Sequence, residues 1–258
     1  MAKPTKNNET AVNAKGKKKR WDGKQTAALV MILIMVFSMG AGVVGWLAGS
    51  TKTTETTTNQ TGTHVGVLNG LDIYKVSDKD YYIDVPTGTG NQPIEWHFRA
   101  NPISAANVSI NNKARYYLGA LATNTKNQFI LSWENITKVY ITFDPYATPE
   151  VIVSGTEIAY GLGAVGWSEG DGKLGTAYTK ESAEHPEVPV MTTRDLLDNK
   201  TEGILAINLY VDNQSLTRIE GMGSNETDKI ILVHGINETD LDLAAVKVKL
   251  SLLGIIEP

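Results

Sequence analysis

The 258-residue sequence predicts one N-terminal transmembrane helix followed by an extracytoplasmic domain of the α/β (or α+β) class, with a mixed sheet and a C-terminal helix. Three observations predict this arrangement. Residues 26–48 form an uncharged apolar run, which at about 1.5 Å per residue can cross the roughly 30 Å hydrocarbon core of a membrane. Beyond residue 64, several short segments alternate apolar and polar residues, as half-buried strands do. Two longer segments, 149–160 and 239–256, have the spacing and start signals of helices.

Charged residues are distributed unevenly around the apolar run. Residues 1–25 carry eight Lys and Arg against two acidic side chains, whereas the chain beyond residue 48 carries ten more acidic than basic side chains. Basic flanks stay in the cytoplasm because moving them across the membrane is costly. We therefore expect a single-pass protein of the cell membrane, with a basic cytoplasmic tail over 1–25, a transmembrane helix over 26–48 and an extracytoplasmic C-terminal domain. The acidic excess also disfavours nucleic acid as a partner, since phosphate contacts need a basic surface.

The apolar run fits an uncleaved anchor better than a signal peptide. It is longer than the core of a typical signal peptide, and Trp46 stands near its exit, where a small residue is needed. A pilin-like leader, processed beside Gly23, is a further alternative. Ala41, Gly45 and Gly49 lie four residues apart, a spacing that lets two helices approach closely. They are candidates for self-association or for packing against a partner helix within the lipid bilayer.

Residues 49–63 form a Thr-rich stalk without a large apolar residue, and we expect the folded domain to occupy 64–258. The absence of cysteine excludes disulfides and thiolate metal sites. The four histidines show no spacing typical of a metal-ligand pair, so no metal or other cofactor is expected.

The first part of the domain predicts an antiparallel hairpin and a third strand. Residues 71–76 and 81–85 are strand-like and are joined by a short polar turn. At 94–98, apolar residues alternate with polar ones, which indicates a strand with one polar face. The segment 101–127 is ambiguous, with a short helix at 114–122, and 128–133 is expected to be a strand.

The clearest local unit follows. Residues 139–143 predict a strand, and Thr148, Pro149 and Glu150 provide a capping hydroxyl, a first-turn proline and an acid near the positive end of a helix. We expect this helix to end near residue 160, before a strand at about 174–179. That order is typical of a β-α-β crossover.

The last part of the domain predicts more strands and a closing helix. A short strand is expected at 188–191, and the strand at 205–211 is expected to turn back and pair with 216–220. The apolar run 230–233 is typical of a central strand. Residues 246–252 alternate like a strand, but 239–256 contains no turn residue in a stretch long enough for a helix, and we expect a helix there.

Three short motifs carry a resemblance: FRANP (residues 98–102), KVYITFDP (138–145) and LLGIIE (252–257). Together with the basic tail and the single anchor, they resemble uncharacterised single-pass membrane-anchored surface proteins of small-genome archaea. The resemblance covers most of the ectodomain and implies a helix after the FDP turn and another at the C-terminus, but no assigned function. Members of that group often carry cysteines in the second half, which this chain lacks, so a thiol-dependent role is not implied.

N-glycosylation sequons are frequent in the part of the chain expected outside the cell. Random placement would give about two or three acceptors of this kind, whereas turns rich in Asn, Ser and Thr are the alternative explanation. We favour a glycoprotein, and without cysteine an archaeal surface protein rather than a eukaryotic one. The candidate acceptors are Asn59, Asn107, Asn135, Asn199, Asn213, Asn225 and Asn237.

Two catalytic motifs match by letter but lack the required context. GLGAVG (161–166) matches the dinucleotide fingerprint, which needs a strand before it and a helix after it, whereas here it follows a predicted helix. GWSEG (166–170) matches the nucleophile elbow, but a glycine-rich loop follows it instead of a helix.

A third pattern is a constellation of side chains at predicted strand ends. Asp144 closes one strand, Asp195 follows the short strand at 188–191, and His234 closes the apolar strand. Since sites gather at the carboxyl ends of parallel strands, these three could converge as the catalytic residues of a hydrolase. Each also fits an ordinary role as a turn, cap or half-buried residue.

Anchor, stalk and sequons place a domain at a distance from the membrane but perform no reaction. We therefore expect a non-catalytic binding or envelope module, whose partner is a surface protein, a surface layer or a glycan. An extracytoplasmic hydrolase using Asp144, Asp195 and His234 is the alternative, and a pilin-like filament subunit is the third hypothesis.

Overall fold

The structure is a computed structural model that describes residues 62–86, 93–123, 136–197, 203–212, 216–222 and 229–257. All of them belong to one compact unit, Asn59–Pro258. The expected tail, transmembrane helix, most of the stalk and the strand expected at 128–133 lie outside the described residues. The same holds for the helix-packing candidates Ala41, Gly45 and Gly49. Within the described segments, no helix is long and apolar enough to cross a membrane.

The described unit contains two sheets. In the first, each strand pairs antiparallel with the next along the chain: β1 (Thr63–Leu68), β2 (Leu71–Ser77), β3 (Asp80–Val85) and β4 (Ile94–Phe98). We call this sheet the meander. The second sheet has six strands in the spatial order β5 (Ser109–Ile110), β9 (Arg218–Met222), β10 (Ile230–Gly235), β8 (Ile204–Val211), β6 (Lys138–Phe143) and β7 (Leu174–Tyr178).

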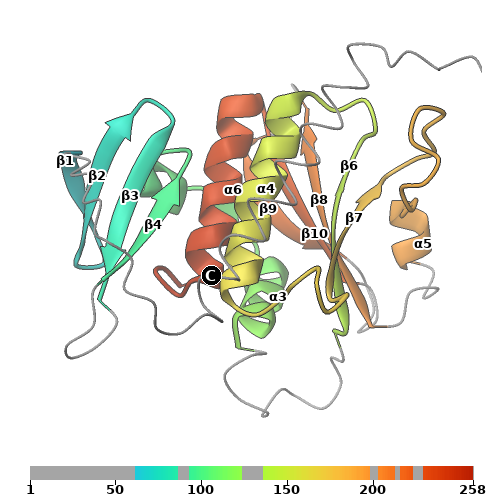
Figure 1. Ribbon diagram of the computed structural model, residues 1–258, viewed down its shortest axis with the longest axis horizontal. Helices are drawn as coiled ribbons and strands as arrows, with labels where there is room; N and C mark the ends of the chain where they lie inside the picture. Colours follow the sequence, from blue (N-terminus) through green and yellow to red (C-terminus); the bar gives the residue numbers. More distant parts are fainter. Residues whose placement is uncertain are drawn as a thin grey trace, which may run out of the picture. The chain divides into compact units, whose positions relative to one another are not determined.

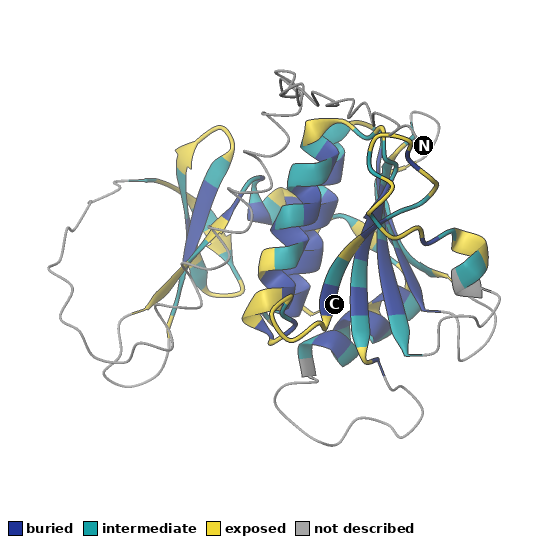
Figure 2. Cartoon of the chain, turned by 45° about the vertical axis from the view of Figure 1, so that its right-hand side comes forward, coloured by how far each residue is buried: buried dark blue, intermediate teal, exposed yellow. Residues whose placement is uncertain are grey.

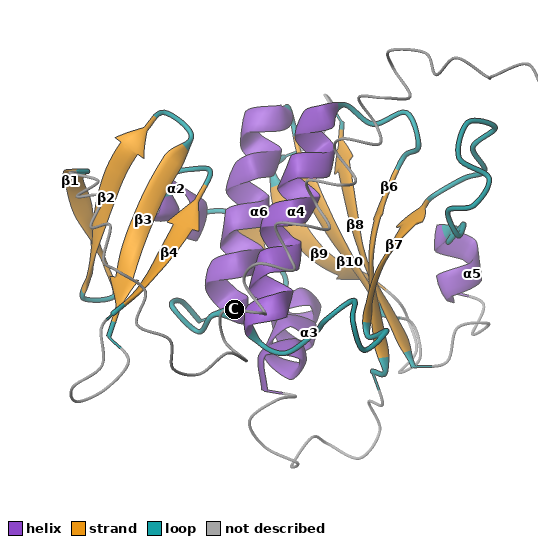
Figure 3. Cartoon of the chain, in the orientation of Figure 1, coloured by secondary structure: helices purple, strands orange, loops and turns teal. Residues whose placement is uncertain are grey.

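Helices α4 (Pro149–Ala164) and α6 (Glu238–Leu252) lie between the two sheets, whereas α5 (Thr193–Leu197) lies beyond β7 (Figures 1 and 3). The other helices of the described segments are α2 (Pro102–Ala106) and α3 (Asn112–Thr123). Helices α3, α4 and α6 contact strands of the six-stranded sheet, and α6 also contacts α2 beside the meander. Buried residues follow the facing sides of the sheets and the helices between them (Figure 2). The mixed α/β class and the C-terminal helix are confirmed.

The meander confirms the expected hairpin and adds one strand that was not expected. Strand β1 begins at Thr63, within the range assigned to the stalk. The turn from β1 to β2 is Asn69-Gly70, whose φ angles are 49° and 82°. Asn-Gly is a strong signal for a two-residue hairpin turn because both residues tolerate positive φ. The sequence therefore contained a signal for β1, which lies almost entirely within the range 64–258 expected to be the folded domain.

The β-α-β crossover is confirmed, because β6 and β7 pair in parallel and α4 connects them. Helix α4 runs to Ala164 rather than ending near residue 160. It continues through Gly161 because that glycine lies against α6, where a Cβ would be 3.1 Å from Lys249 Cγ and 3.2 Å from Leu252 Cδ1. The glycine allows two helices to approach instead of ending one of them.

The pairing expected between 205–211 and 216–220 is wrong. Strand β9 pairs antiparallel with β10, and β10 pairs in parallel with β8. The physical reason is burial, since β10 is apolar on both faces and takes the position between β8 and β9. The short strand expected at 188–191 is reduced to a single bridge between Tyr178 and Val190.

Helix α6 is buried on two opposite sides. Val248 and Leu252 pack into the core of the six-stranded sheet, whereas Val246 and Leu250 pack into the core of the meander. A helix with apolar residues on two opposite sides produces the strand-like alternation seen at 246–252. The helix expected there is confirmed, and the alternation reflects its two neighbours.

We predict that Gly161→Val lowers the free energy of unfolding by about 1–3 kcal/mol, because the new side chain has to enter the contact between α4 and α6. Gly163→Ala is the matched control, because nothing lies within 4 Å of a Cβ there. Alanine is favoured over glycine in helices by up to about 1 kcal/mol. Urea denaturation of the full-length chain measures both variants, and equal stabilities would contradict the close helix contact.

Candidate functional site

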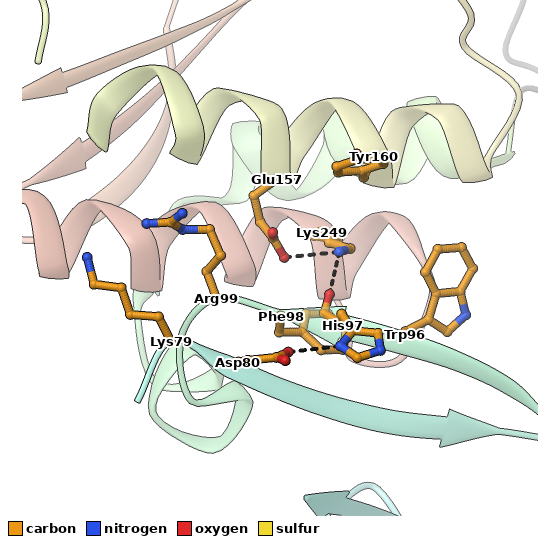
Figure 4. Close-up of a pocket in the computed structure, with 9 residues that line it drawn as sticks. All are labelled: Lys79, Asp80, Trp96, His97, Phe98, Arg99, Glu157, Tyr160 and Lys249. Carbon is orange, nitrogen blue, oxygen red and sulfur yellow. Dashed lines mark hydrogen bonds and ion pairs between the residues drawn. The ribbon is translucent and has the colours of Figure 1, made fainter. Parts of the chain in front are cut away.

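A cleft of about 340 Å³ lies between the meander and helices α4 and α6 (Figure 4). The turn before β3, the first residue of β3, strand β4 and Arg99 after it form one wall, and the two helices form the other. This volume is within the range of about 300–1,000 Å³ typical of small-molecule sites. The lining residues are Lys79, Asp80, Trp96, His97, Phe98, Arg99, Glu157, Tyr160 and Lys249.

A buried ion pair occupies the middle of the cleft. Lys249 Nζ donates to Glu157 Oε1 at 3.0 Å and to the carbonyl oxygen of His97 at 2.6 Å. The side chains of Lys249 and Glu157 are only 5% and 8% exposed. Burial raises the pKa of Glu157, and the Lys249 ammonium opposes this rise without cancelling it. The lysine of α6 thus joins α4 to strand β4.

A second buried acidic group, Asp242 of α6, lies near Arg99. Asp242 Oδ1 accepts a hydrogen bond from Ser154 Oγ at 2.7 Å, and Arg99 Nε lies 3.7 Å from the same oxygen. That distance is an ion-pair contact but too long for a hydrogen bond. Among the described residues, Arg99 Nε has no hydrogen-bond partner. The partly exposed guanidinium therefore adds positive charge at one end of the cleft, although its Nε is buried beside Asp242.

His97 is held between two carboxylates. Its Nδ1 lies 2.8 Å from Asp80 Oδ1, and its Nε2 lies 2.5 Å from Glu95 Oε1. Partial burial lowers the pKa of His97, but the hydrogen bonds and charges of the two carboxylates outweigh burial and raise it. With both ring nitrogens occupied, His97 has no free nitrogen to act as a general base. The polar stripe expected on β4 is thus an internally paired surface.

Aromatic side chains form the other end of the cleft. Tyr160 is 43% exposed, and Trp96 is half-buried (Figure 4). The Lys249 ammonium lies 5.8 Å from the centre of the Tyr160 ring and 4.8 Å from that of Phe98. The aromatic rings at this end of the cleft therefore lie next to the positive charge of Lys249.

Sequence reasoning missed most of this site. Glu157 and Lys249 stand within apolar stretches of helices, IVSGTEIAYG and VKVKL. Charged residues that interrupt the buried side of a helix were the available signal, because such residues are buried only when they are paired. Their partner could not be identified, since the two positions are 92 residues apart.

The hydrolase candidates Asp144 and His234 lie at the same edge of the six-stranded sheet. Asp144 follows β6 and His234 ends β10, and both strands are parallel to β8, which lies between them. Two strand spacings correspond to about 10 Å between their backbones. Among the described contacts, no hydrogen bond or ion pair joins these two side chains. The expected shared edge is present, with β8 between the two groups.

Each of the three candidates has contacts of its own. Asp144 Oδ2 lies 2.7 Å from Lys180 Nζ, and its Oδ1 accepts from the backbone N–H of Tyr146. Partial burial raises the pKa of Asp144, but these contacts outweigh burial and lower it. Asp195 Oδ2 accepts from Thr192 Oγ1 at 2.6 Å at the start of α5.

His234 is fully buried rather than half-buried. Its Nδ1 lies 2.8 Å from the carbonyl oxygen of Leu216, and its ring centre lies 4.7 Å from that of Tyr210. The convergence of Asp144, Asp195 and His234 on a substrate stays a prediction.

The two motifs GLGAVG and GWSEG lie where neither the dinucleotide fingerprint nor the nucleophile elbow could form. The glycines at 161 and 163 lie in the last turn of α4, and no helix begins there. Ser168 lies in the loop before β7, where its Oγ accepts from the backbone N–H of Gly170 at 3.0 Å. Among the described residues, no group of His, Asp and Glu side chains could hold a metal ion.

Two glycosylation candidates lie within the described residues, and both are exposed. Asn107 ends α2, and its Nδ2 donates to the carbonyl oxygen of Ile103. Asn237 caps α6, where its Oδ1 accepts from the backbone N–H of Asp240 at 3.0 Å. The other candidates lie outside the described residues: Asn59, Asn135, Asn199, Asn213 and Asn225.

Comparison of this chain with models of known protein families, with curated proteins and with solved structures finds no match.

Breaking the central ion pair should destabilise the protein strongly. We predict that Lys249→Met lowers the free energy of unfolding at pH 7 by about 3–5 kcal/mol, because Glu157 is left buried without its partner. Combining Lys249→Met with Glu157→Leu should restore most of the loss. Lys180→Met is the control, since it breaks an exposed pair worth at most about 1 kcal/mol. Urea denaturation measures all variants, and similar losses for Lys249→Met and Lys180→Met would refute a special role of burial.

His97 should make stability depend on pH. Its pKa is raised in the folded state, so the stabilisation is fully present below its unfolded pKa of about 6.5 and is lost as pH rises through the folded pKa. We expect His97→Gln to flatten the fall in unfolding free energy above about pH 6.5. His64→Gln, which removes another exposed histidine of the same sheet, is the matched control. Identical pH profiles for the wild type and His97→Gln would contradict the assignment.

Proposed function

We propose that this chain is a membrane-anchored, extracytoplasmic binding module without catalytic activity, and that the cleft beside α4 and α6 is its ligand site. One observation carries the proposal. The cleft's acid–base groups are occupied by internal partners, while Lys79 and Tyr160 are exposed and Trp96 and Arg99 are partly exposed. Such a surface can bind a ligand but offers no free base or nucleophile.

The occupied groups are the ones that a hydrolase would need. Glu157 has a raised pKa and lies in a cleft, which is a common property of a general acid. However, Lys249 lies 3.0 Å from its carboxylate, and removing that partner would leave a buried charge. His97 is likewise held at both nitrogens. These contacts favour a fixed binding surface.

The features outside the described residues support the same proposal. The apolar run 26–48, the basic tail and the Thr-rich segment fit a signal-anchor followed by a spacer. The sequons fit an exported glycoprotein, and two of them are exposed in the described part. The partner would be a surface protein, a surface layer or a glycan.

Two other functions remain as alternatives. An extracytoplasmic hydrolase would use Asp144, Asp195 and His234, and its support is the shared sheet edge of Asp144 and His234. A pilin-like subunit would require processing near residue 23 and assembly through the apolar run. No contact of the described residues favours a filament.

Binding to isolated cell envelopes tests the proposal with the full-length, detergent-solubilised chain. We expect saturable co-sedimentation, which Tyr160→Leu combined with Lys79→Gln weakens at least fivefold because both residues line the cleft. Asp144→Asn should bind as the wild type does, because its contacts are with Lys180 and Tyr146, outside the cleft. If Asp144→Asn loses binding while the cleft variant keeps it, the cleft is the wrong site and the hydrolase hypothesis gains.

A further inference from the structure

We infer that the cleft binds an acidic sugar, with the anionic group at its cationic end and the sugar ring on its aromatic end. This inference rests on the function proposed above and adds the chemical class of the ligand.

Two cationic side chains, those of Lys79 and Arg99, lie at one end of the cleft. Figure 4 shows Lys79 and Arg99 on the same side, to the left of the central ion pair. Lys79 is exposed, and the Arg99 side chain is 28% exposed, with its buried Nε 3.7 Å from Asp242 Oδ1. A guanidinium beside an ammonium favours an anionic group, because charge-assisted hydrogen bonds are about twice as strong as neutral ones.

Acceptors in the cleft are already engaged. Glu157 accepts from Lys249, and Asp80 accepts from His97. A cationic ligand would compete with these internal partners and would meet Lys79 and Arg99. The charges of the cleft therefore select a negative ligand over a positive one.

A flat surface lies at the opposite end. Trp96 and Tyr160 flank Lys249 on the other side from Arg99 (Figure 4). An aromatic ring offers a large apolar face next to a polar edge, and the C–H face of a sugar ring can lie on it. The Glu157–Lys249 ion pair lies between the two ends of the cleft (Figure 4).

The central ion pair decides between a sugar and an aromatic acid. A ligand that reaches from Arg99 to Trp96 has to pass over the polar atoms of Glu157 and Lys249. Lys249 Nζ uses two of its three N–H donors on His97 and Glu157. A purely apolar body placed over the pair would cover its remaining polar edges without making hydrogen bonds to them, which is costly. Hydroxyl groups along a sugar ring can make those bonds. The arrangement of the cleft thus favours a polar ring with a negative group.

Calorimetric titration of the purified full-length chain tests this inference. The probes are a tetramer of galacturonic acid and the same tetramer with its carboxylates methyl-esterified, which removes the charge and keeps the ring. We expect the acid form to bind at least tenfold more tightly than the ester. The galacturonate monomer, run in parallel, distinguishes a free acidic sugar from a polymer as the ligand.

Two variants and a control assign the effect to the cleft. Lys79→Gln, at an exposed position, should weaken binding of the acid form about fivefold and leave the ester unchanged. Tyr160→Leu should weaken both forms. Lys173→Gln removes an exposed lysine outside the cleft and should bind both forms as the wild type does.

The outcomes separate this inference from the function it rests on. Equal affinity for acid and ester would overturn the acidic-sugar inference and leave a binding module intact. Absence of binding to either tetramer and to the monomer would also overturn it, while envelope co-sedimentation would still judge the binding module on its own. Binding of the acid form that Lys79→Gln and Lys173→Gln weaken equally would place the site elsewhere and overturn the assignment to the cleft.

Discussion

The burial of α6 between two sheets is the constraint on which the rest of this structure depends. Beyond its first turn, a helix with neighbours on both sides cannot direct its charged side chains into water, so Asp242, Lys247 and Lys249 need partners inside the protein. Lys249 pairs with Glu157, Asp242 accepts from Ser154, and Lys247 Nζ donates to the carbonyl oxygen of Ala106 at 2.8 Å. Burial and the nearby Arg115 lower the pKa of Lys247. These contacts join α6 to α4, to the end of α2 and to β4.

The same contacts create the candidate site. Lys249 bonds both the carboxylate on α4 and the carbonyl oxygen of His97, so it sets the position of the meander's last strand against the helices. Buried ion pairs often add little net stability compared with apolar packing, but breaking one is costly. We interpret the pair as a device that specifies this arrangement. Arg99 and Trp96 are thereby held at opposite ends of one cleft.

Much of the local structure was predictable because it depends on neighbours in the chain. The alternation at 94–98 and the start of α4 at Pro149 depend only on local periodicity and first-turn residues, and both elements formed where expected. Thr148 is the N-cap of α4, but the capping hydrogen bond expected from its hydroxyl is not made. Pairing between distant strands was not predictable in this way. Strand β10 lies between β8 and β9 because its two apolar faces need cover, and the reading of a hairpin at 212–214 could not include that competition. For the site, the sequence indicated the strand that carries Trp96 and His97. It did not indicate the wall formed by α4 and α6.

The sequence by itself determined an apolar run with a basic flank, a strand-rich acidic domain, a β-α-β unit and a closing helix. These properties follow from composition and from spacings of two and about four residues, which are local. Only the tertiary structure decided that α6 is covered on both sides, that Gly161 is a helix contact and not a helix end, and that Glu157 meets Lys249. Such decisions depend on which surfaces far apart in the chain bury each other, because a buried charge is stable only beside a partner that the fold brings to it.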